Sequence, residues 1–291
     1  MPDDPVTMVR RRFAEELRHT ARVRSPAVVA AFATVPREHF AGPGPWRILS
    51  PGRMADYRTT ADADPRHLYH DVLVAIDEAR RLNNGQPSLW ASLYDKLEPT
   101  SGMHIVHVGA GTGYYSAILA EIVGPAGRVT AIEIDPHLAV RARENLALAW
   151  PWASVVTANG FTFRPDRAAD AIVVNAGVSH LSLAWLDSLA AENGRLLVPL
   201  TNADGVGGFL MIARDAGETH RYPARLVGHT GIIACIGGRD GKAEVRLKAA
   251  LARSDFDAIR SLRRLPDEPD ETCWLAGDGW WLSTAPVAGK T

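Results

Sequence analysis

The chain has 291 residues, and its 32 basic and 33 acidic side chains give a formal net charge of −1. A hydrophobic fraction of 46% is typical of a chain that buries a core and excludes a disordered one. Two cysteines, Cys235 and Cys273, exclude a disulfide scaffold and any metal site of four cysteines. Near-neutral charge, a charged N-terminus and the lack of a long apolar run predict a cytoplasmic protein that binds neither nucleic acid nor a membrane.

The N-terminal part of the chain predicts helices followed by a less regular stretch. Apolar residues between Thr7 and Ala33 recur at helical spacing. Within this stretch, Ser25 followed by Pro26 is a typical start for a second helix. Residues 41–68 predict mostly irregular structure, and residues 71–81 fit either a helix or a strand followed by a turn.

From residue 100 onward the sequence alternates between short apolar runs and helix-length segments. The runs predict strands at 104–108, 128–134, 153–157, 169–174 and 195–199, with helices at 114–123, 137–150 and 181–191. Strands that alternate with helices indicate an α/β fold with a doubly wound, mostly parallel sheet. Because the crossovers of such a sheet are right-handed, the carboxyl ends of its strands meet at one edge, where ligands bind.

Residues 201–291 follow a different pattern. They predict late strands at 209–213 and 232–236, a helix at 244–262 and a hairpin at 274–282. The hairpin carries Trp274, Trp280 and Trp281, and we expect these rings to pack over an edge of the core rather than form a recognition surface.

A glycine-rich turn, Gly109-Ala-Gly111-Thr-Gly113, lies between a predicted strand and a predicted helix. Glycines allow a sharp turn and let a ligand lie against bare backbone, and the helix presents free N–H groups at its start. The dinucleotide motif requires glycine at 114, where Tyr114 stands, and the phosphate-binding motif requires a lysine after its last glycine. The turn therefore favours a nucleoside ligand without a phosphate and argues against a nicotinamide coenzyme.

Glu133 stands at the end of the next predicted strand, twenty residues after Gly113. A carboxylate at this place accepts hydrogen bonds from both hydroxyls of a ribose. Together, the glycine loop and the strand-end carboxylate predict that the chain binds S-adenosylmethionine. The alternative interpretation is a tight turn and a solvated strand end that share this spacing by chance.

The segments VGAGTGYYSAILA at 108–120 and VTAIEIDPHLAVRARENL at 129–146 resemble the protein-L-isoaspartate O-methyltransferases. VPREHF at 35–40, YHD at 69–71 and QPS at 86–88 look like further motifs of this family, so the resemblance covers about residues 7–240. It implies a seven-stranded, Rossmann-like methyltransferase sheet with S-adenosylmethionine as cofactor. It also implies a protein or peptide substrate with a free carboxylate.

Within this resemblance we expect a helical N-terminal region with the substrate loop at 1–98, a methyltransferase core at 99–240 and a C-terminal extension at 241–291. Two departures from the family pattern stand out. Gly85 occupies the place of the hydroxyl residue that usually precedes Gln-Pro, which puts isoaspartyl activity in doubt. Asn159 replaces an aspartate in a Gly-Asp-Gly motif, and its amide both donates and accepts hydrogen bonds, as the edge of adenine requires.

Position and resemblance together assign the candidate residues. The candidates for cofactor binding are Gly109, Gly111, Gly113, Tyr114, Glu133, Asn159, Gly160 and Asn175. The candidates for the substrate loop are Asn84, Gln86 and Ser88, although Ser88 is explained more simply as a helix N-cap. The histidines show no metal-ligand spacing, so we expect no metal site.

A carboxylate acceptor is ionised at neutral pH and needs no general base, so catalysis reduces to positioning and the exclusion of water. An amine or phenol acceptor would need a base, for which His67, His70 and Asp71 are candidates. The first hypothesis is therefore a carboxyl O-methyltransferase that uses S-adenosylmethionine. The alternatives are a methyltransferase for a specialised peptide or small molecule, and a cofactor-binding interaction module without catalysis. The sequence leaves the oligomeric state open.

Overall fold

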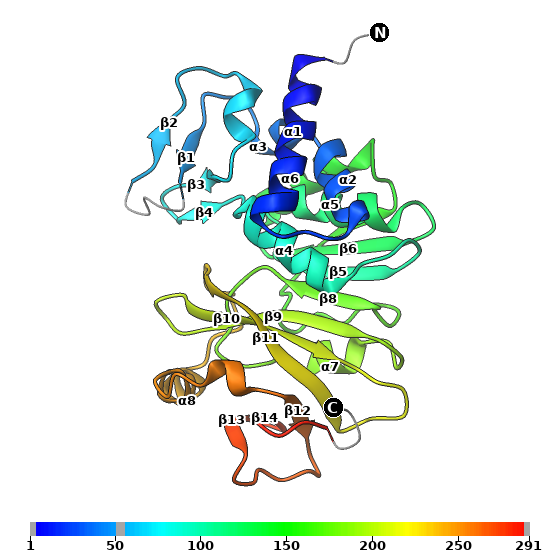
Figure 1. The fold of residues 1–291 in the computed structure, drawn as a ribbon, viewed down its shortest axis with the longest axis vertical. Coiled ribbons are helices and arrows are strands. Elements are labelled where there is room, and N and C mark those ends of the chain that lie inside the picture. The colour runs from blue at the N-terminus through cyan, green and yellow to red at the C-terminus, as the bar shows by residue number, and fades with distance from the viewer. Residues whose placement is uncertain (1–3, 51–55, 288–291) are drawn as a thin grey trace. The chain divides into compact units, whose positions relative to one another are not determined.

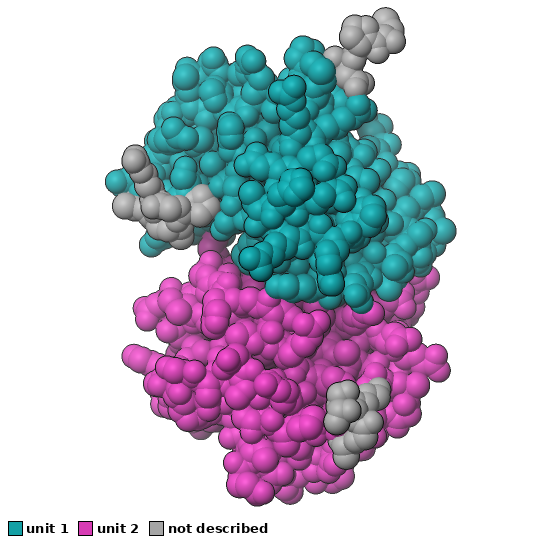
Figure 2. Space-filling model, viewed as in Figure 1, with its two compact units in different colours: residues 1–103, 110–157 teal, residues 104–109, 158–291 magenta. Residues whose placement is uncertain are grey.

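The computed structural model describes residues 4–50 and 56–287, which are drawn in Figure 1. The chain divides into two compact units, coloured separately in Figure 2. Unit 1 comprises Met1–Met103 and Ala110–Thr157, and unit 2 comprises His104–Gly109 and Ala158–Thr291. The chain thus enters unit 2 for one strand and returns to complete unit 1. The domain limits expected at 98 and 240 stay predictions.

Unit 1 begins with helices that pack on one another. They are α1 (Pro5–Thr20), α2 (Pro26–Thr34), α4 (Pro87–Leu97) and α5 (Tyr114–Val123), with the short α3 (Arg37–Ala41) after α2. Ser25 caps α2 by accepting a hydrogen bond from the backbone N–H of Val28, as the sequence predicts. Asp95 on α4 accepts the backbone N–H groups of Arg24 (2.8 Å) and Ser25 (2.7 Å), which fixes the connection between α1 and α2.

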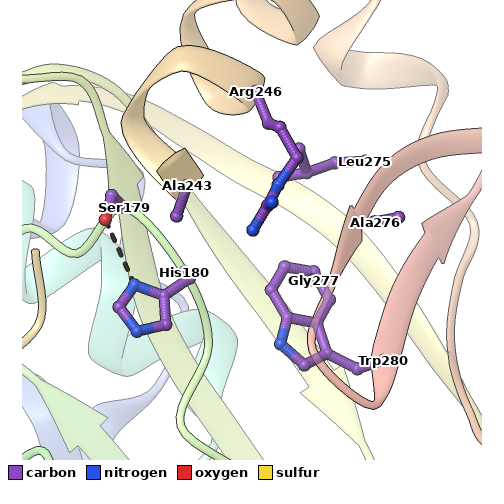
Figure 3. Close-up of a pocket in the computed structure, with 8 residues that line it drawn as sticks. All are labelled: Ser179, His180, Ala243, Arg246, Leu275, Ala276, Gly277 and Trp280. Atoms are coloured by element: carbon purple, nitrogen blue, oxygen red, sulfur yellow. Dashed lines mark hydrogen bonds between the residues drawn. The ribbon is translucent and has the colours of Figure 1, made fainter. Parts of the chain in front are cut away.

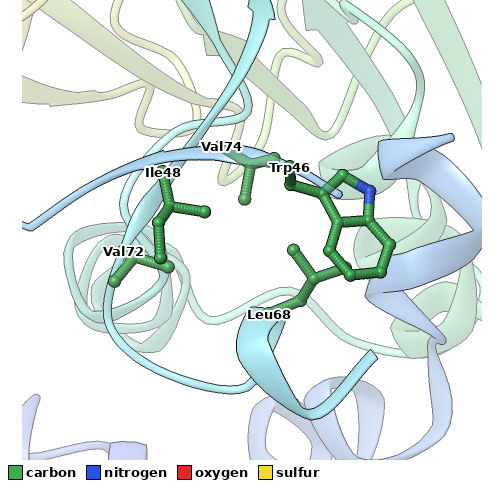
Figure 4. Close-up of a cluster of buried hydrophobic side chains, with 5 residues drawn as sticks. All are labelled: Trp46, Ile48, Leu68, Val72 and Val74. Atoms are coloured by element: carbon green, nitrogen blue, oxygen red, sulfur yellow. The ribbon is translucent and has the colours of Figure 1, made fainter. Parts of the chain in front are cut away.

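A small antiparallel sheet forms in the part of unit 1 where the sequence predicts mostly irregular structure. Its strands, in sheet order, are β2 (Arg58–Thr59), β1 (Arg47–Leu49), β3 (Leu73–Asp77) and β4 (Leu82–Asn83), with the 3-10 helix η1 (Pro65–Leu68) before β3. Figure 4 shows the buried side chains beneath it, which are Trp46, Ile48, Leu68, Val72 and Val74. The segment 71–81 is therefore a strand and a turn. Because each strand is short, the sheet needs this shared apolar cluster to be stable.

The α/β pattern predicted from residue 100 onward is confirmed. In unit 1, β6 (Arg128–Glu133) and β7 (Ala153–Thr157) pair in parallel and are connected by α6 (Pro136–Ala147). In unit 2, β5 (His104–Val108), β8 (Ala171–Val174) and β9 (Arg195–Thr201) pair in parallel, with α7 (Leu183–Ser188) between β8 and β9. Buried apolar runs form these strands because both faces of a parallel sheet are covered.

Antiparallel strands extend the sheet of unit 2 beyond β9. In sheet order they are β10 (Val206–Ala213), β11 (Arg221–Gly231), β12 (Ser261–Arg264), β14 (Trp280–Ser283) and β13 (Cys273–Gly277). The predicted number of seven strands is therefore not confirmed. The predicted hairpin at 274–282 is present as β13 and β14.

Two predictions for the C-terminal region are wrong. The apolar run 232–236 is not a strand, because the long strand β11 ends before it at Gly231. Pro223 and the glycines of β11 hid this strand from the sequence pattern. The helix expected at 244–262 is shorter, since α8 (Gly241–Leu251) is followed by the 3-10 helix η2 (Phe256–Ala258) and then by β12. Ser254 has a positive φ of 57°, which does not fit a continuous helix.

The three tryptophans of the C-terminal hairpin are buried, which confirms that they pack in a core. The ring of Trp274 stacks on Phe256 with 4.8 Å between the centroids. Trp281 donates its indole N–H to the carbonyl oxygen of Asp267 (2.8 Å), and the guanidinium of Arg263 lies 4.6 Å from its ring centroid. No helix in the described ranges is long and apolar enough to span a membrane.

We expect Trp281→Ala to lower the free energy of unfolding by about 3–5 kcal/mol, because it leaves a large cavity among buried side chains. Val245→Ala, at an exposed position on α8, is the control and should change stability by less than about 0.5 kcal/mol. Denaturant titration followed by circular dichroism measures both values. An unchanged main transition in Trp281→Ala would show that the hairpin is not part of the cooperative core.

Candidate active site

The glycine-rich loop between β5 and α5 needs its glycines. Gly109, Gly111 and Gly113 have φ angles of 84°, 57° and 96°, a region that other residues rarely adopt. A Cβ atom on Gly113 would lie 3.4 Å from the side chain of Leu146 on α6. The side-chain amide of Asn145, also on α6, donates to the carbonyl oxygen of Thr112 (2.8 Å). Helix α6 therefore supports the loop, and the backbone of the loop stays bare.

Glu133 is the last residue of β6, and its carboxylate contacts the glycine loop directly. One carboxylate oxygen accepts the backbone N–H of Gly111 (2.7 Å), and the other accepts the N–H of Asp135 (3.0 Å). Only 7% of the residue is exposed. Burial raises the pKa of Glu133 above its usual value, and the backbone N–H groups offset this effect only in part.

This arrangement fits a ligand that carries a ribose. An ionised carboxylate offers about four acceptor positions, so Glu133 has capacity beyond its backbone partners. Its raised pKa means that the donors present do not compensate for burial. Two ribose hydroxyls would supply further donors to the ionised form. The three glycines of the neighbouring loop carry no side chains that could block the approach of such a ligand.

Tyr114 follows the loop and lies in the interior of unit 1. Its ring makes edge contacts with Phe40 and Phe32, at centroid distances of 5.7 Å and 6.4 Å, and the guanidinium of Arg37 lies 5.8 Å from its centroid. Burial raises the pKa of Tyr114 to about 12. The hydroxyl has no hydrogen-bond partner within the described parts of the chain. The ring thus anchors the start of α5, and a contact between Tyr114 and the cofactor stays a prediction.

Gln86 and Ser88 of the predicted substrate loop meet at Asp71. The carboxylate of Asp71 accepts the side-chain amide of Gln86 (2.8 Å), the hydroxyl of Ser88 (2.7 Å) and the backbone N–H of Ser88 (2.9 Å). Ser88 lies inside α4, whose N-cap is Gln86, so the interpretation of Ser88 as the N-cap is wrong. Asp71 satisfies a free N–H of the first turn from outside the helix.

Asn84 and Gly85 complete the loop. Asn84 is buried, and its side-chain nitrogen has no hydrogen-bond partner among the residues that the structure describes. Gly85 has a φ of 63°, and a Cβ atom there would lie 2.8 Å from the ring of Tyr115 and 2.9 Å from the indole nitrogen of Trp90. The two rings occupy the space that a side chain at 85 would need.

Arg37 is a residue to which the sequence analysis assigned no role. It is fully buried, and its guanidinium donates to the carbonyl oxygens of Leu68 (2.7 Å), His70 (3.2 Å), Val72 (2.6 Å) and Gly85 (3.4 Å). It therefore joins α3 both to the chain around Asp71 and to the substrate loop. The VPREHF motif that contains Arg37 was the only signal in the sequence.

In unit 2, three of the cofactor-binding candidates surround the end of β5. The backbone N–H of Asn175 donates to the carbonyl oxygen of Val108 (2.8 Å). A Cβ atom on Gly109 would lie 3.1 Å from the carbonyl oxygen of Asn175, and one on Gly160 would lie 2.3 Å from Val108 Cγ1. Both glycines are therefore required by close packing.

Asn159 is the fourth candidate in unit 2, and its side-chain oxygen makes a hydrogen bond within its own turn. This oxygen accepts the backbone N–H of Phe161 (2.9 Å) and stabilises the turn after β7. The amide also lies close to Gly237, where a Cβ atom would approach its nitrogen to 2.5 Å. A contact between Asn159 and adenine stays a prediction.

A small pocket lies elsewhere in unit 2, between the chain after β8, helix α8 and the β13–β14 hairpin. Figure 3 shows the side chain of Arg246 extending between His180 and Trp280. The hydroxyl of Ser179 pairs with the ring of His180 (3.1 Å) and accepts the backbone N–H of Asp240 (3.0 Å). No residue that the sequence singled out as a cofactor or substrate candidate lines this pocket.

Comparison with known proteins gives a consistent result. The family model described as Protein-L-isoaspartate(D-aspartate) O-methyltransferase matches residues 58–222. The protein-L-isoaspartate O-methyltransferase of Aeropyrum pernix is 32% identical over 203 residues, which cover 69% of this chain and 70% of the relative. The enzyme of the same name from Pyrobaculum neutrophilum is 31% identical over 198 residues, 67% of this chain and 84% of the relative.

Solved structures share the fold. One protein-L-isoaspartate O-methyltransferase has a TM-score of 0.64 at 21% identity, covering 84% of this chain and 69% of its own. A putative protein-L-isoaspartate O-methyltransferase from Plasmodium falciparum, in complex with S-adenosyl-L-homocysteine, has a TM-score of 0.60 at 18% identity, covering 78% and 97%. The fold, the glycine loop and the strand-end acid define an S-adenosylmethionine-dependent methyltransferase. The chain belongs to the protein-L-isoaspartate(D-aspartate) O-methyltransferase family.

We expect Arg37→Met to lower the free energy of unfolding by about 2–4 kcal/mol, because it leaves several buried carbonyl oxygens without a donor. Arg12→Met, at an exposed position on α1, is the control and should have almost no effect. Thermal and denaturant unfolding measure the difference. Equal stability of the two variants would contradict the structural role of the Arg37 guanidinium.

Proposed function

We propose that the protein transfers a methyl group from S-adenosylmethionine to the carboxylate of an isoaspartyl residue in a protein or peptide. The observation that carries this proposal is the contact between the glycine loop and Glu133, in a chain whose relatives bear the name of this activity. In unit 1, the donor would lie along Gly111 and Gly113, with its ribose on Glu133. Gly109, Asn159, Gly160 and Asn175 stay proposed donor contacts.

The chain's own residues orient the donor and exclude water in this reaction. Bound S-adenosylmethionine supplies a methyl group that its sulfonium charge already activates. The bare loop backbone and Glu133 orient the donor. Because an acceptor carboxylate is ionised at neutral pH, no residue has to remove a proton, and rate enhancement comes from alignment and the exclusion of water.

We place the acceptor at the substrate loop. Asp71 holds the side chains of Gln86 and Ser88 in fixed positions. The side-chain nitrogen of Asn84 is a buried donor without a partner in the described structure, and a carboxylate oxygen would satisfy it. The unpartnered amide of Asn84 thus supports a carboxylate acceptor. An amine acceptor would need a free base, and the candidate base Asp71 already accepts hydrogen bonds from Gln86 and Ser88.

One assay tests the proposal. The protein is incubated with radiolabelled S-adenosylmethionine and a matched pair of aspartyl and isoaspartyl peptides. Selective, base-labile labelling of the isoaspartyl peptide supports the proposal. Donor binding without turnover on any acceptor would favour an interaction module instead.

Glu133→Ala should weaken the binding of S-adenosylhomocysteine by about 1–3 kcal/mol, the scale for losing buried hydrogen bonds. Ribose hydroxyls donate to the ionised carboxylate, and the pKa of Glu133 is raised in the free protein. Affinity should therefore fall as the pH is lowered from neutral toward the raised pKa of Glu133, since protonation removes the negative charge to which the ribose hydroxyls donate. Glu133→Gln should lack this part of the pH dependence. Calorimetry measures both effects, and wild-type affinity in Glu133→Ala would exclude the ribose contact.

Gly85 favours a second candidate function, methylation of a specialised peptide or small molecule. The resemblance places a hydroxyl residue at this position, whereas here Tyr115 and Trp90 fill the space of a side chain. A substrate loop packed in this way presents a different surface to the acceptor. Labelling of neither peptide in the assay, together with turnover on another acceptor, would support this candidate.

We expect that Gly85→Ser will not improve isoaspartyl methylation and will lower stability by about 1–3 kcal/mol through crowding and a positive φ. Gly102→Ser is the matched control, because Gly102 also has a positive φ but nothing lies within 4 Å of its Cβ position. The smaller loss of stability that we expect for Gly102→Ser measures the cost of the positive φ without crowding. A stable Gly85→Ser protein with faster isoaspartyl turnover would show that position 85 is open to the acceptor.

We propose that the protein acts in a reducing, cytoplasmic compartment on protein or peptide partners rather than on nucleic acid or membranes. The two free cysteines, Cys235 and Cys273, and the net charge of −1 support this setting.

A further inference from the structure

The β3–β4 hairpin lies against the two features that define the donor site of unit 1. The terminal methyl of Ile76, on β3, lies 3.5 Å from the position that a Cβ atom on Gly111 would occupy. Arg80, in the turn of the hairpin, donates to a carboxylate oxygen of Asp135 (2.5 Å). Asp135 is two residues beyond Glu133 and gives its backbone N–H to the Glu133 carboxylate.

The Asp135 carboxylate is held in place by hydrogen bonds other than the one from Arg80. It also accepts the backbone N–H groups of His137 (2.8 Å) and Leu138 (3.1 Å) and so caps α6. Arg80 donates at the same time to the carboxylate of Asp77 (2.7 Å) at the end of β3. The guanidinium therefore joins the hairpin to the start of α6, and these pairings lower the pKa values of Asp77 and Asp135.

A second arginine connects the same hairpin to β1 of the small sheet. Arg47 on β1 makes two hydrogen bonds of 2.8 Å to the carboxylate of Glu78, which lies two residues before Arg80. Both arginines are about half exposed. Arg47 ties the turn to its own small sheet, whereas Arg80 ties it to the residues next to Glu133. This difference provides an internal control.

We propose that the β3–β4 hairpin forms one wall of the donor site, with Ile76 as an apolar surface beside Gly111 and Arg80 as the positioning residue that holds the wall to Asp135. The inference rests on the proposed function, because it concerns the same methyl donor. In this proposal the Arg80 ion pairs hold the wall against the bound product, and breaking them sets the rate of product release. Exposed ion pairs weaken in salt, so release should become faster as ionic strength rises.

The test measures the dissociation rate of S-adenosylhomocysteine from the full-length protein by stopped-flow fluorescence. Arg80→Gln should raise this rate about three- to tenfold, and Arg47→Gln should change it less than about twofold. Arg80→Lys should fall between wild type and Arg80→Gln, because lysine keeps the charge but not the bridging geometry. Between about 0.05 and 0.5 M salt, the wild-type rate should rise and the Arg80→Gln rate should stay nearly constant.

A second pair of variants tests the wall itself. Ile76→Ala should raise the dissociation constant of S-adenosylhomocysteine about three- to tenfold through the loss of apolar contact. Val140→Ala, at an exposed apolar position on α6, should leave it unchanged. Circular dichroism confirms that each variant is folded.

The outcomes separate the two proposals. Suppose that the wild-type protein binds S-adenosylhomocysteine and methylates its substrate, and that Arg80→Gln and Ile76→Ala release and bind S-adenosylhomocysteine as the wild type does. This result would overturn the proposal that the hairpin forms a wall of the donor site, and it would leave the proposed function intact. Equal acceleration by Arg80→Gln and Arg47→Gln would also overturn it, because the effect would then come from general loosening of the hairpin. A wild-type protein that fails to bind S-adenosylhomocysteine would overturn the proposed function.

Discussion

The hydrogen bond between Glu133 and the backbone of Gly111 is the constraint on which the donor site depends. A buried carboxylate is costly unless donors surround it, and here the backbone N–H groups of the loop and of the chain after β6 provide them. The same bond sets the position of the loop relative to the strand. Because α6 starts three residues after Glu133 and supports the loop through Asn145, the strand, the loop and the helix are held together by these contacts. The acid keeps a raised pKa, so its environment favours a ligand that brings further donors.

A second buried charge organises the substrate side of unit 1. Arg37 donates to the backbone carbonyl oxygens of Leu68 and Val72, in the chain that leads into β3, and to that of Gly85. These oxygens belong to loops, which lack the regular backbone partners of helices and strands, and one planar guanidinium satisfies several of them at once. The crowding of Gly85 by Tyr115 and Trp90 belongs to the same region. At the position where the family resemblance places a hydroxyl residue, these two rings thus fill the space of a side chain.

The regions where the sequence-based predictions were wrong share a physical cause. The run 232–236 and the helix expected at 244–262 were inferred from local hydrophobicity, yet their neighbours in the sheet decide their structure. β11 is a strand despite Pro223 because it pairs with β10 along most of its length. β12 is a strand because it lies between β11 and β14. The small sheet of unit 1 likewise depends on Trp46 and Val74, which are far apart in the sequence.

The sequence by itself determined the α/β class, the strands and helices from β5 to β9, the glycine loop and the identity of its acidic partner. These features depend on short-range patterns: apolar runs, helical periodicity and glycines at positions that require a positive φ. Only the tertiary structure decided that Asp71 holds Gln86 and Ser88, that Arg37 joins the loops, and that Arg80 reaches Asp135. Each of these contacts joins residues that are distant along the chain, and their geometry follows from packing, which local sequence patterns do not encode.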